Sequence, residues 1–146
     1  LQIARGQQAL AQALAAGGQH DVYVLQAQIA ACHAAARQAA DTDWARIAAL
    51  YAQLLQVMPS PVVALNRVVA VSRSDGAFAP WALLQPLLDD ARLQGYAPLQ
   101  VVRGELLLQL GREADAREAF AMAAAQSPNA AERAVLRERA GHAPEN

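Results

Sequence analysis

Residues that interrupt helices recur in this chain at a spacing of 35 residues, at Asp41, Gly76 and Gly111. Each of them lies between two stretches of helical length whose apolar residues are three and four positions apart. The alternation of apolar and polar residues that is typical of strands is absent throughout. A period of this length matches one pair of antiparallel helices, so the sequence predicts a stack of two-helix units without a sheet.

The last unit carries the clearest repeat pattern. Counted from Ala97, small, large and helix-ending residues fall where tetratricopeptide (TPR) repeats place them, at Gly104, Leu107, Gly111, Ala116, Phe120, Ala123 and Pro128. In this interpretation the small residues let two helices approach closely and Phe120 fills the space between them. Gly111 then makes the turn between the helices, and Pro128 ends the unit.

The predicted fold is all-α: a TPR-like right-handed α-α superhelix of about eight helices, in one domain over residues 1–146. It consists of an N-terminal helix, three helix pairs at about 27–60, 62–95 and 97–130, and a C-terminal capping helix. Residues 44–51 also resemble the start of a TPR first helix. The 35-residue period instead makes this helix the second of its pair, and we follow the period.

Composition excludes several classes of protein. Hydrophobic residues make up 55% of the chain and charged residues 17%, which supports a packed core and excludes wholesale disorder. The net charge is -1 and acidic residues interleave with the arginines, so we expect no direct contact of this segment with nucleic acid. Because no apolar run reaches roughly 18 residues, no signal peptide opens the chain and a single cysteine is present, we expect a cytoplasmic protein without membrane contact.

The sequence offers little that could carry catalysis. Cys32 and His33 are adjacent, hence about 100° apart on a helix, which is poor geometry for proton transfer. We expect a small buried thiol beside an imidazole at the edge of the core. His20 and His142 have no metal-ligand spacing with His33, and no glycine-rich phosphate loop is present. The sequence therefore predicts no enzyme, no metal and no cofactor; an enzymatic alternative would have to use Cys32 and His33.

Two polar segments are candidates for a structural or binding role. Asp41 and Asp43 directly precede a helix, where aspartate commonly accepts hydrogen bonds from free backbone N–H groups. The stretch over 62–72 is apolar almost all round, which predicts a helix between neighbours. Asn66 is expected on the inner side of this helix, where its amide needs a partner in a neighbouring turn, and Arg67 is expected to point away.

Four strings of residues resemble one known family. They are AQIAACHAAA (27–36), DTDWARIAALYAQLL (41–55), PSPVVALNRVVAV (59–71) and GYAPLQVVRGELLLQLGREADAREAF (95–120). Together they are similar, over about residues 22–139, to the C-terminal extension of a class of bacterial extracytoplasmic-function (ECF) RNA polymerase sigma factors. In that class a TPR-like helical domain follows the two sigma regions. The chain departs from the family at Val68, where alanine is usual, and near Ala97 and Gln100, where histidine is common.

The resemblance implies a function in transcription initiation. Sigma regions upstream of Leu1 would bind core RNA polymerase and promoter DNA, whereas this segment would regulate through contacts with protein. Its partner would be its own sigma regions, the polymerase or a regulator. The matching motifs point to Asp41, Thr42, Asp43, Trp44, Asn66 and Arg67 as either a polar joint between helix pairs or a protein-interaction site. A free-standing TPR adaptor that binds peptides or helices of partner proteins is the alternative.

Overall fold

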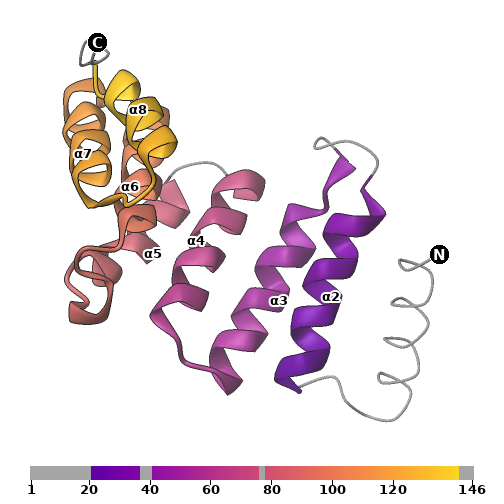
Figure 1. Ribbon diagram of the computed structural model, residues 1–146. Coiled ribbons are helices and arrows are strands. Elements are labelled where there is room, and N and C mark those ends of the chain that lie inside the picture. The colour runs from indigo at the N-terminus through magenta and orange to yellow at the C-terminus, as the bar shows by residue number, and fades with distance from the viewer. Residues whose placement is uncertain (1–20, 37–40, 76–77, 142–146) are drawn as a thin grey trace. The chain divides into compact units, whose positions relative to one another are not determined.

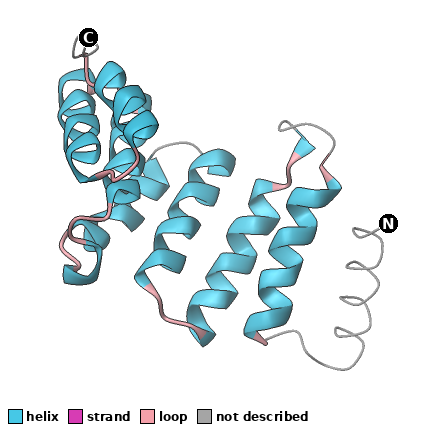
Figure 2. Ribbon diagram, in the orientation of Figure 1, coloured by secondary structure: helices cyan, strands magenta, loops and turns pink. Residues whose placement is uncertain are grey.

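The computed structural model describes residues 21–36, 41–75 and 78–141. Within these ranges it has α-helices and a short 3-10 helix but no strand, which confirms the all-α prediction for this part of the chain (Figures 1 and 2). The elements are α2 (Val22–Ala35), α3 (Trp44–Val57), α4 (Pro61–Asp75), α5 (Phe78–Leu88), η2 (Ala91–Leu93), α6 (Ala97–Gln109), α7 (Glu113–Gln126) and α8 (Ala130–Arg139). The predicted N-terminal helix lies outside the described residues, as do His20, Gly76 and His142.

The chain divides into two compact units, with the boundary between Ser74 and Asp75. The first unit contains α2, α3 and all but the last residue of α4, and the second contains α5 to α8. The boundary falls within the helix pair expected at 62–95. The single domain expected over residues 1–146 stays a prediction.

Turn and cap residues set the helix ends in the way their chemistry suggests. Before α3, the carboxylate of Asp43 accepts a hydrogen bond from the Arg46 N–H at 3.1 Å. Between α6 and α7, Gly111 has a φ of 78°, a left-handed conformation that glycine adopts without steric cost. The N–H of Arg112 donates to the Leu107 carbonyl at 2.8 Å and that of Gly111 to the Leu108 carbonyl at 3.0 Å. These two bonds form a Schellman motif, which ends α6.

The core of the first unit joins all three of its helices. Its buried residues are Leu25 and Ile29 of α2, Ile47, Leu50 and Leu54 of α3, and Val63 and Ala70 of α4. Helix α4 also buries Leu65 and Val68, which lie on the side opposite Val63. A helix that is apolar almost all round is thus buried on two sides, as its sequence pattern predicts.

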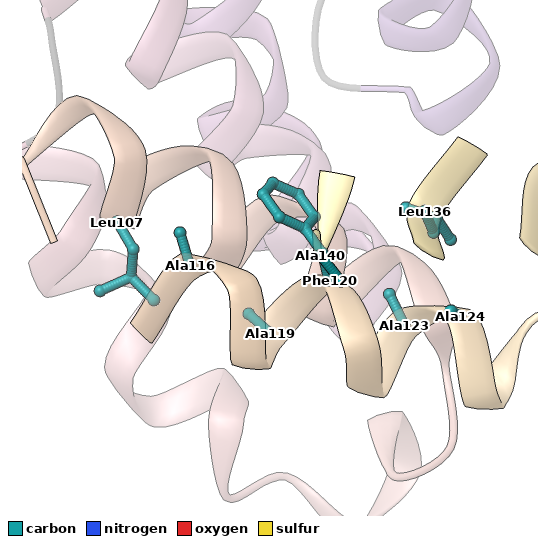
Figure 3. Close-up of a cluster of buried hydrophobic side chains, with 8 residues drawn as sticks. All are labelled: Leu107, Ala116, Ala119, Phe120, Ala123, Ala124, Leu136 and Ala140. Carbon is teal, nitrogen blue, oxygen red and sulfur yellow. The ribbon is translucent and has the colours of Figure 1, made fainter. Parts of the chain in front are cut away.

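The core of the second unit depends on a close contact between α6 and α7. Phe120 lies in a cluster of small side chains from α7 and apolar residues of α6, of α8 and of the C-cap after α8: Leu107, Ala116, Ala119, Ala123, Ala124, Leu136 and Ala140 (Figure 3). A Cβ atom on Gly104 would lie 2.7 to 2.9 Å from three carbons of the Phe120 ring. The ring therefore packs directly on the α6 backbone, where only glycine leaves enough room.

The residues of the TPR-like pattern occupy distinct places in this unit. Gly104, Leu107, Ala116, Phe120 and Ala123 are buried in or beside the core. Gly111 lies in the turn after α6. Pro128 is exposed in the short link between α7 and α8.

Replacing Gly104 by alanine tests the close contact. In the wild-type background we expect the clash with Phe120 to destabilise the protein, because overpacking costs about 1–3 kcal/mol and alanine regains only about 1 kcal/mol through its helix propensity. In a Phe120→Leu background, where the ring is gone, the same Gly104→Ala change should be neutral or stabilising. Urea unfolding followed by circular dichroism measures both effects. An equal effect of Gly104→Ala in the two backgrounds would contradict the proposed packing.

Candidate functional site

An open groove lies over the three helices of the first unit. It is lined by Gln26, Ile29, Ala30 and His33 of α2, Tyr51 and Leu54 of α3, and Val63 and Asn66 of α4. Its volume is about 360 Å³, near the lower end of the roughly 300–1,000 Å³ that is typical of ligand pockets. Helix α3 lies between α2 and α4 (Figure 1), so each of the three contributes one side of the groove.

Helical periodicity explains which residues reach the groove. Positions three, four and seven apart lie on one face of a helix, and the four lining residues of α2 follow this spacing from Gln26 to His33. Tyr51 and Leu54 are three positions apart on α3, as are Val63 and Asn66 on α4. The groove is therefore formed by one stripe of side chains from each helix.

The groove has an apolar base and a polar rim. Ile29, Leu54 and Val63 are only 7%, 2% and 6% exposed and belong to the core. Gln26, Ala30, His33 and Asn66 are exposed. Tyr51 is half-buried, and this burial raises the pKa of its hydroxyl group, so the phenol is neutral at physiological pH.

The polar side chains of the rim are available to a ligand. Within the part of the chain that the structure describes, the side chains of Gln26, Tyr51 and Asn66 form no hydrogen bond with another residue. None of the described residues that line the groove carries a carboxylate, an ammonium or a guanidinium group. The rim therefore offers the hydrogen-bonding groups of Gln26, Tyr51 and Asn66 beside the basic imidazole of His33.

One aromatic residue joins the three helices beside the groove. The Trp44 ring, at the start of α3, packs against the first-unit core. Its centroid lies 5.5 Å from that of the His33 ring, at an interplanar angle of 76°. The Arg73 guanidinium of α4 lies 5.7 Å from the Trp44 ring centroid, within the range of a cation–π interaction. Trp44 therefore holds α2 and α4 against α3 at one end of the unit.

The sequence-predicted site residues do not gather in one place. Asp43 caps α3, Thr42 is half-buried and its carbonyl accepts a hydrogen bond from the Trp44 N–H at 3.0 Å, and Asp41 is exposed. These residues lie together before α3, whereas Asn66 lies on the groove rim. His33 and Arg73, the partners of Trp44, were not among the candidates. Their role depends on contacts between helices, for which the sequence carries no local signal.

The expectation for Asn66 and Arg67 was wrong. Asn66 is exposed and forms no hydrogen bond with a described turn, whereas Arg67 is half-buried. The reason is their position around α4: at 100° per residue, Asn66 and Arg67 flank Val63 on opposite sides. The groove opens on the Asn66 side. A helix that is apolar almost all round does not reveal from its pattern which flank is open.

Cys32, His33 and candidate metal ligands were the other groups considered among the described residues. Cys32 is half-buried beside the first-unit core, and His33 is exposed on the rim. Across residues 21–36, 41–75 and 78–141, no group of three or more histidine, cysteine, aspartate or glutamate residues could hold a metal ion. The helices in the same ranges are each too short or too polar to span a bilayer.

Comparisons with known proteins give one relative. The chain is similar to an uncharacterized protein of Rhizobium meliloti (strain 1021), with 48% identity over 120 residues. The alignment covers 82% of this chain but 28% of the relative, so the chain spans less than a third of that protein's length. No protein-family model matches the chain, and no solved structure matches it.

Two substitutions of Asp43 separate the stabilising effect of its capping hydrogen bond from that of its negative charge. Asp43→Ala should lower the free energy of unfolding by about 1 kcal/mol, because the first turn of α3 loses its hydrogen-bond acceptor. Asp43→Asn keeps an acceptor oxygen and should change stability little. Urea unfolding midpoints of the two variants provide the measurement. Equal losses for both would mean that the negative charge, rather than the cap, is what stabilises the helix.

The raised pKa of Tyr51 makes stability depend on pH in alkaline solution. The unfolded chain loses this proton near the ordinary pKa of 10.0, whereas the folded chain retains it. The unfolded state then binds fewer protons, so the free energy of unfolding falls as the pH rises from about 10 through the folded-state pKa. Tyr51→Phe should remove this part of the decline. Unfolding midpoints of both proteins between pH 8 and 11 should converge or cross; parallel curves would contradict the assignment.

Proposed function

We propose that this chain is the regulatory extension of an ECF-type RNA polymerase sigma factor and modulates transcription initiation through protein–protein contacts. The groove over α2, α3 and α4 carries the proposal, because it is open and the side chains of Gln26, Tyr51 and Asn66 in its lining form no hydrogen bond with another described residue. Such a surface suits a protein partner. The similarity of four strings between residues 27 and 120 to the extension of these sigma factors supplies the link to transcription.

The helix order supports the finer fold that this proposal includes, a TPR-like right-handed α-α superhelix. The bounds of α2 with α3, α4 with α5 and α6 with α7 agree with the helix pairs of the 35-residue period, and α8 follows as a capping helix. The contact between Gly104 and Phe120 is the close approach that the small residues of a TPR pair permit. A stack of such pairs presents an extended surface for partners.

The length of the relative fits a larger parent protein. The Rhizobium meliloti protein is more than three times as long as the stretch that matches this chain, which leaves room for two sigma regions. In this proposal those regions engage core RNA polymerase and promoter DNA in the cytoplasm. The segment described here contacts protein: its own sigma regions, the polymerase or a regulator.

Deletion of residues 22–139 from the native gene tests the proposal. We expect transcription from the promoters that the parent protein recognises to change, while its sigma regions still bind core polymerase. Reporter assays measure transcription, and co-purification with polymerase measures binding. The same gene with Gln56→Ala, a change on the exposed face of α3 outside the groove, serves as the control.

Two results would contradict the proposal. One is unchanged transcription after the deletion under every growth condition tested. The other is a gene that encodes no sigma regions upstream of Leu1, which would favour the free-standing adaptor.

A further inference from the structure

We propose that Met122 of α7 is a site of reversible oxidation by peroxide, and that Arg103 of α6 holds the resulting sulfoxide by a hydrogen bond. The oxidised side chain then joins α7 to α6 more firmly than the thioether does. This chemistry belongs to the second unit and is independent of the groove of the first unit, on which the proposed function depends.

The Met122 side chain is accessible to a small oxidant. It is 41% exposed on α7. The other methionine of the chain, Met58, is half-buried and packs against the first-unit core. Because peroxide must reach the sulfur atom in order to oxidise it, we expect Met122 to react before Met58.

A positively charged donor already lies beside the Met122 sulfur. The Arg103 Nη1 atom is 3.9 Å from this sulfur and donates a hydrogen bond to the Gln100 Oε1 atom at 3.1 Å. A thioether is only a weak acceptor, whereas a guanidinium group has five N–H donors and a permanent charge. Within the described part of the chain, Arg103 forms no ion pair with a carboxylate. The guanidinium therefore retains donors for a stronger acceptor at the sulfur.

Oxidation supplies that acceptor. A lone pair of the sulfur forms a bond to one oxygen of hydrogen peroxide, the O–O bond breaks, and the departing hydroxide leaves as water with the proton of the transferred hydroxyl group. The sulfur loses two electrons and the peroxide gains them. Because the Met122 sulfur is already 3.9 Å from Arg103 Nη1, its new oxygen can lie at about 2.7–3.2 Å, the range of an N–H···O hydrogen bond. Sulfoxide reductases reverse the reaction.

The new hydrogen bond would join helices whose contact supports the second unit. Arg103 directly precedes Gly104, on whose backbone the Phe120 ring of α7 packs. A hydrogen bond from a charged donor is stronger than one between neutral groups, so the sulfoxide adds a polar link beside this apolar contact. At Met58 the same oxidation would place a polar group against the core and destabilise the first unit.

Peroxide treatment of the isotope-labelled 146-residue chain tests the inference. Subsequent dithiothreitol restores reversibly oxidised Cys32 but leaves methionine sulfoxide in place. Mass spectrometry of proteolytic peptides should show faster oxygen addition at Met122 than at Met58. In nuclear magnetic resonance spectra, the guanidinium signals of Arg103 should shift once Met122 is oxidised. Urea unfolding should show a folding equilibrium constant about 2- to 10-fold larger, the effect of one added hydrogen bond.

Variants assign this gain to the pair. In Arg103→Leu, which lacks the donors, oxidation of Met122 should no longer increase the folding equilibrium constant. Arg117→Leu removes another arginine of the second unit, at an exposed position of α7, and should respond to peroxide as the wild type does. Met122→Leu should abolish the shift of the Arg103 signals.

Three results would overturn the inference: oxidation of Met58 as fast as that of Met122, unchanged guanidinium signals of Arg103 after Met122 is oxidised, or an equal effect of oxidation on unfolding with and without Arg103. The signals of Arg103 are measured in the unsubstituted protein, so this readout does not depend on the folding of a variant. Reporter assays of the deletion of residues 22–139 remain the separate test of the proposed function.

Discussion

Close contact between helices through small side chains is the constraint on which the second unit depends. Its helices have 10 to 14 residues, a length at which isolated helices are marginal in water, so they gain their stability from packing. Gly104 lets the Phe120 ring lie on the backbone of α6. Ala116, Ala119 and Ala123 of α7 are fully buried. Because each side chain is only a methyl group, neighbouring helices can pack close to the backbone of α7. Larger side chains at these positions would separate the helices and expose the ring, because closely packed cores have little free volume.

The first unit also depends on packing between its helices, but a groove remains open over α2, α3 and α4. Helix α3 places Ile47, Leu50 and Leu54 in the core between α2 and α4, and Trp44 joins the three helices at one end through His33 and Arg73. The buried stripes of α2 and α4 face α3, so the flanking residues of each stripe border a groove above it. The groove is therefore a direct consequence of how three helices bury their apolar faces, and its polar rim follows from the residues next to those faces.

Sequence patterns predicted the features that arise within a few residues of one another. The cap at Asp43 and the turn at Gly111 follow from local hydrogen bonding and from the conformational freedom of glycine. The interpretation failed at Asn66, because α4 is apolar almost all round and its periodicity does not distinguish an enclosed flank from an open one. It also missed His33 and Arg73 as partners of Trp44. Each is unremarkable within its own helix, and only the packing of α2 and α4 on α3 brings them to one ring.

By itself, the sequence determined that the described chain is helical, where several helices begin and end, and that a glycine would face a large side chain in the last pair. These properties depend on backbone conformation and on spacing along one or two neighbouring helices. The tertiary structure alone decided that Gln26, Tyr51 and Asn66, from three different helices, border one groove. It also decided that Arg73 lies over Trp44. The physical reason is that such contacts depend on the relative rotation and separation of packed helices, which the many core side chains set together and no local pattern contains.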